Sequence, residues 1–318
     1  MTTVISAAGL QKRFGRTVAL DGLDLDVQSG EVHGFLGPNG AGKSTTIRIL
    51  LGLARTSGGT AALFGENPWK HAAELHRRVA YVPGDVSLWP NLTGGEAIDL
   101  LARLRGGTGD RAGYAARKQR LLEVFDFDPR KKGRAYSKGN RQKVALIAAF
   151  ATPAELYILD EPTSGLDPLM EQVFNREIAR VAGEGATVLL SSHILSEVEE
   201  LCDRVSIIRA GKTVESGTLA ELRHLTRTEI AFAADGLDPA ALAAEIDRIP
   251  DAHDLVIDHG RASFTVDSDR VASVLPELTR LEVRALTVSP PSLEELFLRH
   301  YGDELTERVA EPVEGARA

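Results

Sequence analysis

The pattern of apolar and polar residues predicts strands and helices in alternation along the first two thirds of the chain. Up to about residue 30 the alternation is strand-like, as in VALDGLDLDV. EVHGFLG, ELYILD and ATVLLSSH are short apolar runs, typical of parallel strands buried on both faces. STTIRILLGL, LMEQVFNREIARVA and LSEVEELCDR have helical spacing, and the stretch from about 90 to 134 is predicted to be largely helical. The pattern therefore predicts an α/β fold whose ligands bind beyond the carboxyl ends of the strands.

A second pattern begins after about Arg223. Strand, helix, hairpin, helix and strand follow one another in TEIAFAA, DPAALAAEIDRI, DLVIDHGRASFTVD, DRVASVLPELTR and EVRALTV. This βαββαβ order predicts a small α+β ferredoxin-like domain, with the hairpin turning at His259-Gly260. We expect one domain over residues 1–222, with a helical subdomain at about 88–150, and a second over 223–301. SLEELFLRHYG predicts a last helix, and the charged tail 302–318 is expected to be disordered.

Composition narrows the class of protein. The chain has 318 residues, of which 43% are hydrophobic and 26% charged, and its formal net charge is -8. This acidic balance argues against a general nucleic-acid binder. The single cysteine, Cys202, excludes an internal disulfide and is expected to be a buried residue on a helix. No signal-peptide pattern or apolar stretch of about 20 residues is present, so we expect a cytosolic protein that reaches a membrane only through a partner.

A glycine-rich stretch, GPNGAGKST, runs from Gly37 to Thr45 and fits the phosphate-loop pattern G-x-x-x-x-G-K-[ST]. Glycines let backbone N–H groups turn toward phosphates, and the following helix points its positive end at them. Lys43 is predicted to reach the β- and γ-phosphates, while the Ser44 hydroxyl ligates Mg²⁺. The flanking strand and helix favour this over an ordinary glycine turn. The expected ATP-binding residues are Gly37, Pro38, Asn39, Gly40, Ala41, Gly42, Lys43, Ser44 and Thr45.

A pair of carboxylates, Asp160 and Glu161, ends the apolar run LYILD. Asp160 at a strand end can hold Mg²⁺, directly or through water, and Glu161 can orient or deprotonate an attacking water. Alone, such a pair is often a solvated strand end. Next to a phosphate loop, the catalytic interpretation is favoured.

Together with three further motifs, these two make the sequence resemble the nucleotide-binding subunit of an ABC transporter over residues 4–222. GPNGAGKST resembles the Walker A loop and LYILDEP the Walker B strand with its catalytic glutamate. SGLD, from Ser164 to Asp167, resembles the D-loop, and the histidine of SSH, His193, resembles the switch histidine. YSKGNRQKV resembles the signature usually written LSGGQ. The C-terminal part is similar to the extension on ATPases of ABC-2-type exporters, which include drug and antibiotic efflux systems.

The resemblance implies the following roles. Two subunits close head to tail around two ATP molecules, as a homodimer or a heterodimer, at the cytoplasmic face of the membrane beside an ABC-2-type permease. Phe14 stacks on adenine, although core packing is the alternative, and His193 positions the attacking water. Four signature residues contact the ATP bound by the mate: Ser137, Lys138, Gly139 and Asn140.

The sequence departs from the family at two motifs. Gly84 stands where a glutamine usually contacts Mg²⁺ or water, and Asp85 follows it. We expect a working ATPase with altered coupling or metal geometry. Lys138 replaces the first signature glycine and is either a cation near the mate's phosphates or a solvated residue. Leu88 and Trp89 are expected to line the groove that receives the permease's coupling helix, with core packing of Trp89 as the alternative.

Two other classes of protein remain as alternatives. One is a soluble ABC ATPase that acts on DNA or ribosomes, and the other is a nucleotide-binding regulator with weak turnover. A single nucleotide domain and the acidic balance argue against the first, and Glu161 argues against the second. The C-terminal domain has no catalytic constellation and is expected to regulate or dimerise.

Overall fold

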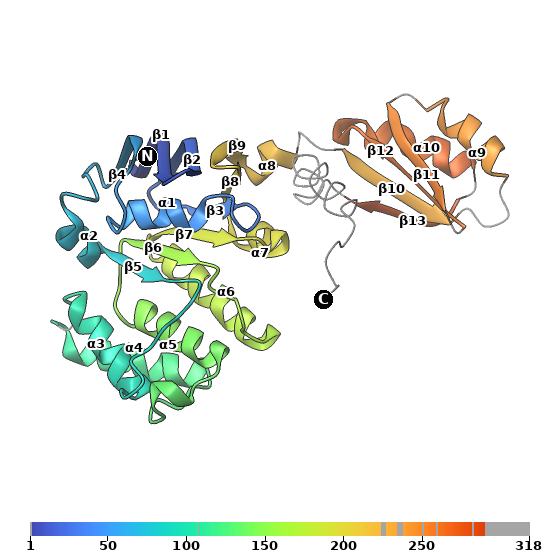
Figure 1. The fold of residues 1–318 in the computed structure, drawn as a ribbon. Coiled ribbons are helices and arrows are strands. Elements are labelled where there is room, and N and C mark those ends of the chain that lie inside the picture. The colour runs from blue at the N-terminus through green and yellow to red at the C-terminus, as the bar shows by residue number, and fades with distance from the viewer. Residues whose placement is uncertain are drawn as a thin grey trace, which may run out of the picture. The chain divides into compact units, whose positions relative to one another are not determined.

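The structure is a computed structural model that describes residues 2–107, 109–223, 227–233, 238–249, 251–258, 260–281 and 283–289. The chain folds as two compact units and passes from one to the other between Ser216 and Gly217. Figure 1 labels the helices and strands of both units. Each unit has its own cluster of buried apolar side chains, and thus a core of its own.

A six-stranded sheet in the order β5-β6-β7-β3-β8-β9 is the main sheet of the first unit. Its strands are β3 (Val32–Leu36), β5 (Val79–Val82), β6 (Leu156–Asp160), β7 (Thr187–Ser192), β8 (Arg204–Arg209) and β9 (Lys212–Thr218). The strands from β5 to β8 pair in parallel, and every residue of β3, β6 and β7 is buried. Because parallel strands share a direction, the loops after β3, β6 and β7 leave the sheet at one edge.

A second, antiparallel sheet has the order β2-β1-β4. Its strands are β1 (Thr3–Phe14), β2 (Thr17–Gln28) and β4 (Gly58–Leu63). The strand-like alternation up to residue 30 is confirmed as the β1–β2 pair. β4 was not predicted, because its polar, glycine-rich residues lack alternation. Helix α1 (Lys43–Leu50) follows the phosphate loop, and its Ile47 shares a core cluster with Leu10 and Leu23 of this sheet.

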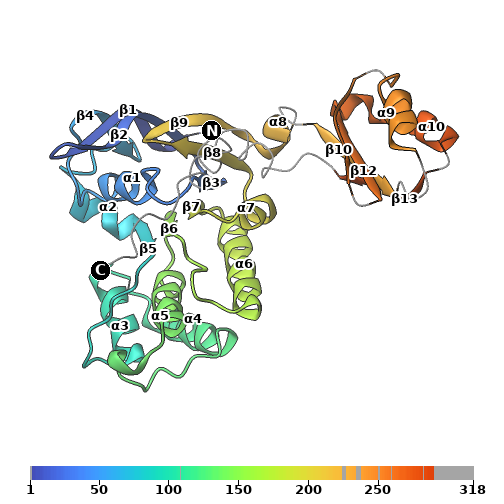
Figure 2. The same cartoon turned by 45° about the vertical axis from the view of Figure 1, so that its right-hand side comes forward.

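The helices of the first unit fall into two groups. α3 (Gly94–Leu104) and α4 (Arg111–Val124) pack against α5 (Lys138–Ala151), as Figure 2 shows below the sheet, and a short 3-10 helix spans Gly133–Ala135. α2 (Ala72–Arg78), α6 (Pro168–Gly183) and α7 (Leu195–Leu201) are the others. The Thr93 hydroxyl accepts a hydrogen bond from Glu96 N and the Glu96 carboxylate accepts one from Thr93 N, a capping box that begins α3.

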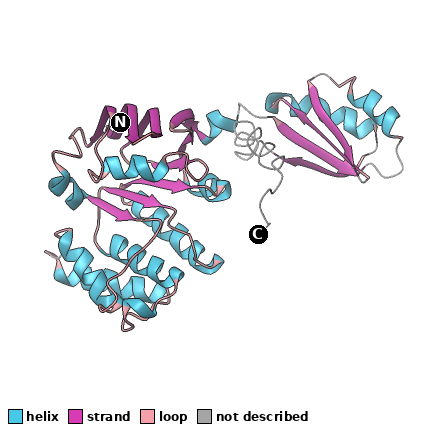
Figure 3. Ribbon diagram, viewed as in Figure 1, coloured by secondary structure: helices cyan, strands magenta, loops and turns pink. Residues whose placement is uncertain are grey.

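The second unit has the predicted βαββαβ order. After α8 (Leu219–Arg223) come β10 (Thr228–Ala233), α9 (Pro239–Ile246), β11 (Ala252–Asp258), β12 (Arg261–Val266), a 3-10 turn (Ser268–Arg270), α10 (Val271–Arg280) and β13 (Arg284–Ser289). The antiparallel sheet runs β11-β12-β10-β13, the ferredoxin-like arrangement. Helices α9 and α10 lie on one side of it, and their apolar residues share its core (Figure 3).

Of the features expected from the sequence, three lie outside the described residues and one is corrected. His259, the predicted helix SLEELFLRHYG and the tail 302–318 lie outside the described residues. Cys202 is buried, as expected, but lies one residue beyond the end of α7 rather than on a helix, and burial raises the pKa of its thiol. Within the described ranges, no helix is both long enough and apolar enough to cross a bilayer.

Candidate active site

The phosphate loop joins the end of β3 to the start of α1. Gly42 directly precedes the helix with a φ of 115°, a conformation that disfavours side chains. A Cβ at this position would also lie 2.7 Å from Leu20 Cδ2. The predicted succession of strand, glycine loop and helix is confirmed.

Lys43 lies at the base of this loop, with only 5% of its side chain exposed. Its Nζ donates hydrogen bonds to the carbonyl oxygens of Gly37 and Pro38, the latter at 3.2 Å, and lies 3.8 Å from Glu161 Oε1. Burial lowers the pKa of Lys43, while the nearby charges of Glu161 and Asp160 oppose that shift. The loop therefore holds a buried cation directly beside the strand that carries both carboxylates.

The ends of β6 and β7 carry the remaining predicted catalytic groups. Ser191 Oγ donates a hydrogen bond to Asp160 Oδ1 at 2.8 Å, and Glu161 N donates one to Ser191 O at 2.9 Å. His193 Nδ1 lies 3.3 Å from Glu161 Oε1. The Glu161 carboxylate is thus close to both Lys43 and His193, which together form a cation–carboxylate–histidine cluster. Sequence reasoning had not singled out Ser191, which holds Asp160 in place.

Two side chains offer oxygen atoms suited to Mg²⁺. The Ser44 hydroxyl is exposed at the start of α1, and Asp160 Oδ2 has no hydrogen bond among the described residues. Hydroxyl and carboxylate oxygens are hard ligands, and Mg²⁺ is commonly bound by one or two protein groups together with substrate phosphates. No group of three or more His, Cys, Asp or Glu side chains with metal-site geometry occurs in the described part of the chain.

Gly84 lies close to the end of β6. A Cβ at Gly84 would lie 3.2 Å from Asp160 O and 3.8 Å from Asp160 Cγ. Asp85, the next residue, is exposed. Tyr81, three residues before Gly84, has its pKa raised to about 12, mainly by burial and secondly by the charge of Asp160. A neutral phenol and a glycine thus occupy this side of the site.

The signature residues begin α5 and contact the D-loop of the same protomer. Ser137 caps the helix by accepting a hydrogen bond from Asn140 N at 3.3 Å. Lys138 Nζ donates to Ser164 Oγ at 2.7 Å. Gly139 packs so closely on Gly165 that a Cβ there would lie 2.3 Å from its carbonyl oxygen. Lys138 is therefore exposed but bonded to the D-loop, an arrangement that sequence reasoning had not considered.

Two further predicted residues lie near the ends of elements. Asp167, the last D-loop residue, caps α6 by accepting a hydrogen bond from Met170 N at 3.0 Å. Phe14 ends β1 and is 52% exposed, with Lys12 Nζ 4.7 Å from its ring centroid. The Phe14 ring does not pack into the core, and its exposed face is free to stack.

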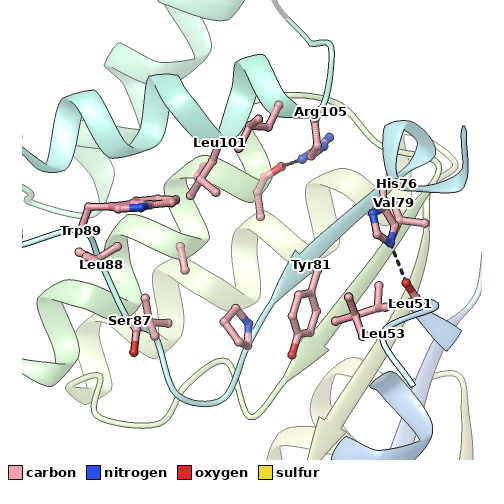
Figure 4. Close-up of a pocket in the computed structure, with 16 residues that line it drawn as sticks. Leu51, Leu53, His76, Val79, Tyr81, Ser87, Leu88, Trp89, Leu101 and Arg105 are labelled. Atoms are coloured by element: carbon pink, nitrogen blue, oxygen red, sulfur yellow. Dashed lines mark hydrogen bonds between the residues drawn. The ribbon is translucent and has the colours of Figure 1, made fainter. Parts of the chain in front are cut away.

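An apolar groove lies beside α3 and α5, and its lining includes no residue of the phosphate loop. It has a volume of about 370 Å³, and Trp89 is 46% exposed there. Figure 4 shows Tyr81, Trp89 and Leu101 bordering this hollow. We call this the apolar groove; it is lined by Leu51, Leu53, His76, Val79, Tyr81, Pro83, Val86, Ser87, Leu88, Trp89, Leu101, Leu104, Arg105, Ala145, Ala148 and Ala149.

Arg105 brings a positive charge to the apolar groove. Its guanidinium donates hydrogen bonds to the carbonyl oxygens of Ala149, Thr152 and Pro153, at 3.1, 2.6 and 3.0 Å. Burial lowers its pKa. Its Nε is buried and has no hydrogen-bond partner among the described residues. No carboxylate within the described ranges forms an ion pair with this guanidinium.

The geometry defines a class first: a phosphate loop opposite a strand that ends in two carboxylates is the site of a P-loop nucleoside triphosphatase. Comparison with known proteins then narrows the class. Residues 20–164 match the family described as ABC transporter, and residues 217–301 match the C-terminal domain of DrrA1-3-like ATP-binding proteins.

Relatives match both units together. The daunorubicin/doxorubicin resistance ATP-binding protein DrrA of Streptomyces peucetius is 36% identical over 324 residues, 98% of this chain and 97% of the relative. The bacitracin transport ATP-binding protein BcrA of Bacillus licheniformis is 32% identical over 320 residues, 95% of this chain and 98% of the relative. A solved ATP-binding subunit of an ABC transporter aligns with a TM-score of 0.65 and 33% identity, over 70% of this chain and 93% of that chain. This chain belongs to the ABC transporter family as an ATP-binding subunit, and its activity is ATP hydrolysis.

Proposed function

We propose that this chain powers an ABC-2-type exporter by hydrolysing ATP on behalf of a separate membrane permease. The observation that carries the proposal is the match to DrrA and BcrA over 95% or more of this chain, with the C-terminal unit included. The names of these relatives describe drug resistance and antibiotic transport, so the proposed cargo belongs to the same broad class. The chain works at the cytoplasmic face and contacts the membrane only through the permease.

We assign the chemistry to the cluster around Glu161. Lys43 leaves its loop carbonyls to bind the β- and γ-phosphates. Glu161 orients or deprotonates the water that attacks the γ-phosphorus, and His193 hydrogen-bonds the γ-phosphate and steadies that water. Ser44 and Asp160 would hold Mg²⁺, the latter directly or through water, and the ion would supply positive charge against the phosphate oxygens. Phe14 stacks on adenine with its exposed ring.

Each nucleotide is held between two subunits in this proposal. The phosphate loop of one protomer faces Ser137 and Gly139 of its mate, whose α5 points its N-terminal N–H groups at the γ-phosphate. Lys138 and Asn140 belong to the same turn. The mate is a second copy of this chain or a related subunit. Since Lys138 is bonded to Ser164, capture of the mate's phosphate would also move the D-loop on which Ser164 lies.

The glycine at position 84 affects coupling more than hydrolysis. The cation Lys43 and the histidine His193 both lie within 3.8 Å of the carboxylate of Glu161, the proposed base. What the site lacks is a side chain from residue 84 that could touch metal or water. We therefore propose a competent ATPase that reports its nucleotide state to the permease by other contacts.

The apolar groove is the proposed docking surface for the permease. Its walls suit the apolar face of a short helix, and Arg105, which pairs with no carboxylate among the described residues, suits an acidic side chain on that helix. Half-exposed Trp89 provides an aromatic anchor.

The two tryptophans of the chain provide a matched test of docking. Trp69 and Trp89 are each 46% exposed, but Trp69 stacks under Arg55 outside the groove. We expect Trp89→Ala to reduce co-purification of the subunit with its permease by about tenfold or more, the effect of losing an interface anchor. Trp69→Ala is expected to leave co-purification unchanged.

Transport and ATPase assays complete the experiment. Cells that express both wild-type subunits are expected to export a drug or antibiotic, and Trp89→Ala to lose export while its basal ATPase activity remains. Equal behaviour of the two tryptophan variants would contradict the docking assignment. Failure of any polytopic membrane protein to co-purify with the wild-type subunit would contradict the exporter assignment itself.

A further inference from the structure

One carboxylate joins the two loops that carry the catalytic residues. Glu197 lies on α7, four residues after His193. Its Oε1 accepts a hydrogen bond from Thr163 Oγ1 at 2.6 Å, and its Oε2 accepts one from Ser192 Oγ at 2.8 Å. Both hydroxyl-bearing residues are buried, with 5% and 2% exposure. The contact therefore connects the chain after Glu161 with the chain around His193.

The bond to Ser192 fixes the turn that presents His193. While Ser192 Oγ donates to Glu197, it also accepts a hydrogen bond from Ile194 N at 2.9 Å. The hydroxyl therefore ties together the residues on either side of His193. The histidine side chain is 48% exposed and has little packing of its own, so its position depends on this turn.

The bond to Thr163 supports a strained backbone at Glu161. Glu161 has a φ of 47°, in the left-handed region that costs a non-glycine residue about 1–3 kcal/mol and persists only where its surroundings enforce it. Ser164 N donates to Glu161 O at 3.1 Å and Leu166 N to Thr163 O at 2.9 Å, which makes a tight turn. Thr163 is the part of this turn that Glu197 holds.

We propose that Glu197 is a positioning residue for ATP hydrolysis, which sets the 3.3 Å separation between Glu161 and His193 and makes the D-loop and the switch turn move together. It touches neither nucleotide nor water. Because it binds both loops through one rigid carboxylate, displacement of either loop is transmitted to the other. Residue 84 has no side chain that could make such a connection. The Glu197 carboxylate therefore provides a direct path between His193 and the D-loop.

A simpler role must be distinguished from this one. Glu197 lies in the first turn of a helix whose N-cap, Ile194, offers no side-chain cap, and an acidic residue there stabilises the helix dipole. Glu197→Asp separates the two roles, since it keeps the charge but is one methylene too short to reach both hydroxyls. Glu197→Ala removes both roles. Glu200→Ala is the matched control, because Glu200 is exposed on the same helix and bonds only Asn175 in the described structure.

The experiment measures steady-state ATPase activity and hydrogen exchange on the full-length chain. We expect Glu197→Ala and Glu197→Asp to lower kcat by about 10- to 100-fold, with KM for ATP within about threefold of wild type, because the phosphate loop is untouched. Exchange is expected to rise together in segments 161–166 and 191–195, while Glu200→Ala changes neither quantity.

Thr163→Val tests the coupling directly. If Glu197 acts through Thr163, the double variant Thr163→Val with Glu197→Ala is expected to be no slower than Glu197→Ala alone, within about twofold. Recovery of wild-type kcat by Glu197→Asp, or increased exchange confined to α7, would assign Glu197 to helix stabilisation and overturn the proposal. Multiplicative effects of the two substitutions would also overturn it.

Discussion

Both units of the chain combine sheets with helices, yet they differ in where their polar groups gather. In the first unit, the parallel strands β3, β6 and β7 end at one edge, and Lys43, Glu161 and His193 follow them. In the second unit, the antiparallel strands end at both edges of the sheet. Some of its ion pairs are local, such as Arg248–Glu245 and Arg280–Glu277, three residues apart along the chain, whereas Arg227 pairs with Asp254 and Asp267 farther along the chain.

This difference follows from strand direction. Parallel strands bring residues that are far apart in sequence to one edge, where a ligand can meet several loops at once. Antiparallel strands distribute their loops, so the second unit has a well-packed core, with Phe232 and Phe264 at a ring distance of 6.4 Å, but no matching cluster among its described residues. Chemistry is therefore expected to depend on the first unit, and the second is expected to act through its surface.

The largest effect should come from removing the proposed base. We expect Glu161→Gln to lower kcat by about 10²- to 10⁴-fold, the usual contribution of a general base, while ATP still binds. The measurement is phosphate release, together with the affinity for a fluorescent ATP analogue. Glu155→Gln, at the opposite end of the same strand, is the control and should behave as wild type. Unaltered turnover in Glu161→Gln would contradict the assignment, and negligible turnover in the wild type would favour a regulator.

The substitution Phe232→Ala is expected to destabilise the second unit and to leave the first unit unchanged. Phe232 is fully buried, so the truncation is expected to cost that unit about 3–5 kcal/mol in free energy of unfolding. Hydrogen exchange of residues 228–266 should increase, while ATPase activity stays within about twofold. Val256→Ala, at a site 56% exposed, is the control. A parallel fall in ATPase activity would show that catalysis depends on the second unit.

A smaller loss of stability is expected when an ion pair of Glu177, in the first unit, is broken. Burial favours the neutral form of Glu177, but hydrogen bonds from Arg120 and Arg180 outweigh it, and the pKa of Glu177 is lowered below its usual 4.5. A carboxyl group with a depressed pKa in the folded protein stabilises it above the unfolded pKa, and this contribution is lost as pH falls through the folded pKa.

Arg120→Ala tests this ion pair. We expect it to lower the free energy of unfolding at neutral pH by about 1–3 kcal/mol, because the buried carboxylate loses one partner. The difference from wild type should begin to shrink as the pH falls below the unfolded pKa of a glutamate, about 4.3, and should vanish as the pH falls through the lowered pKa of folded Glu177. Denaturant melts at several pH values measure it. A difference that persists unchanged at low pH would exclude Glu177 as its source.

The sequence was sufficient wherever the signal is local. The phosphate loop, the carboxylate pair after β6 and the βαββαβ order all depend on neighbouring residues, and the structure agrees with each. The contacts of Glu197 and Lys138 could not be predicted, since their partners Thr163 and Ser164 are 34 and 26 residues away. Strand β4 was missed for a different reason: its pairing with β1 is set by the neighbouring strand rather than by its own composition.

Residue 84 has a consequence for any attempt to restore the family's glutamine. A Cβ at that position would lie 3.2 Å from the carbonyl oxygen of Asp160, closer than side chains comfortably approach backbone. Substituting glutamine would therefore require the Asp160 carbonyl or residue 84 to move by a few tenths of an ångström. Whether the end of β6 yields by that much decides whether a glutamine side chain is tolerated beside Asp160.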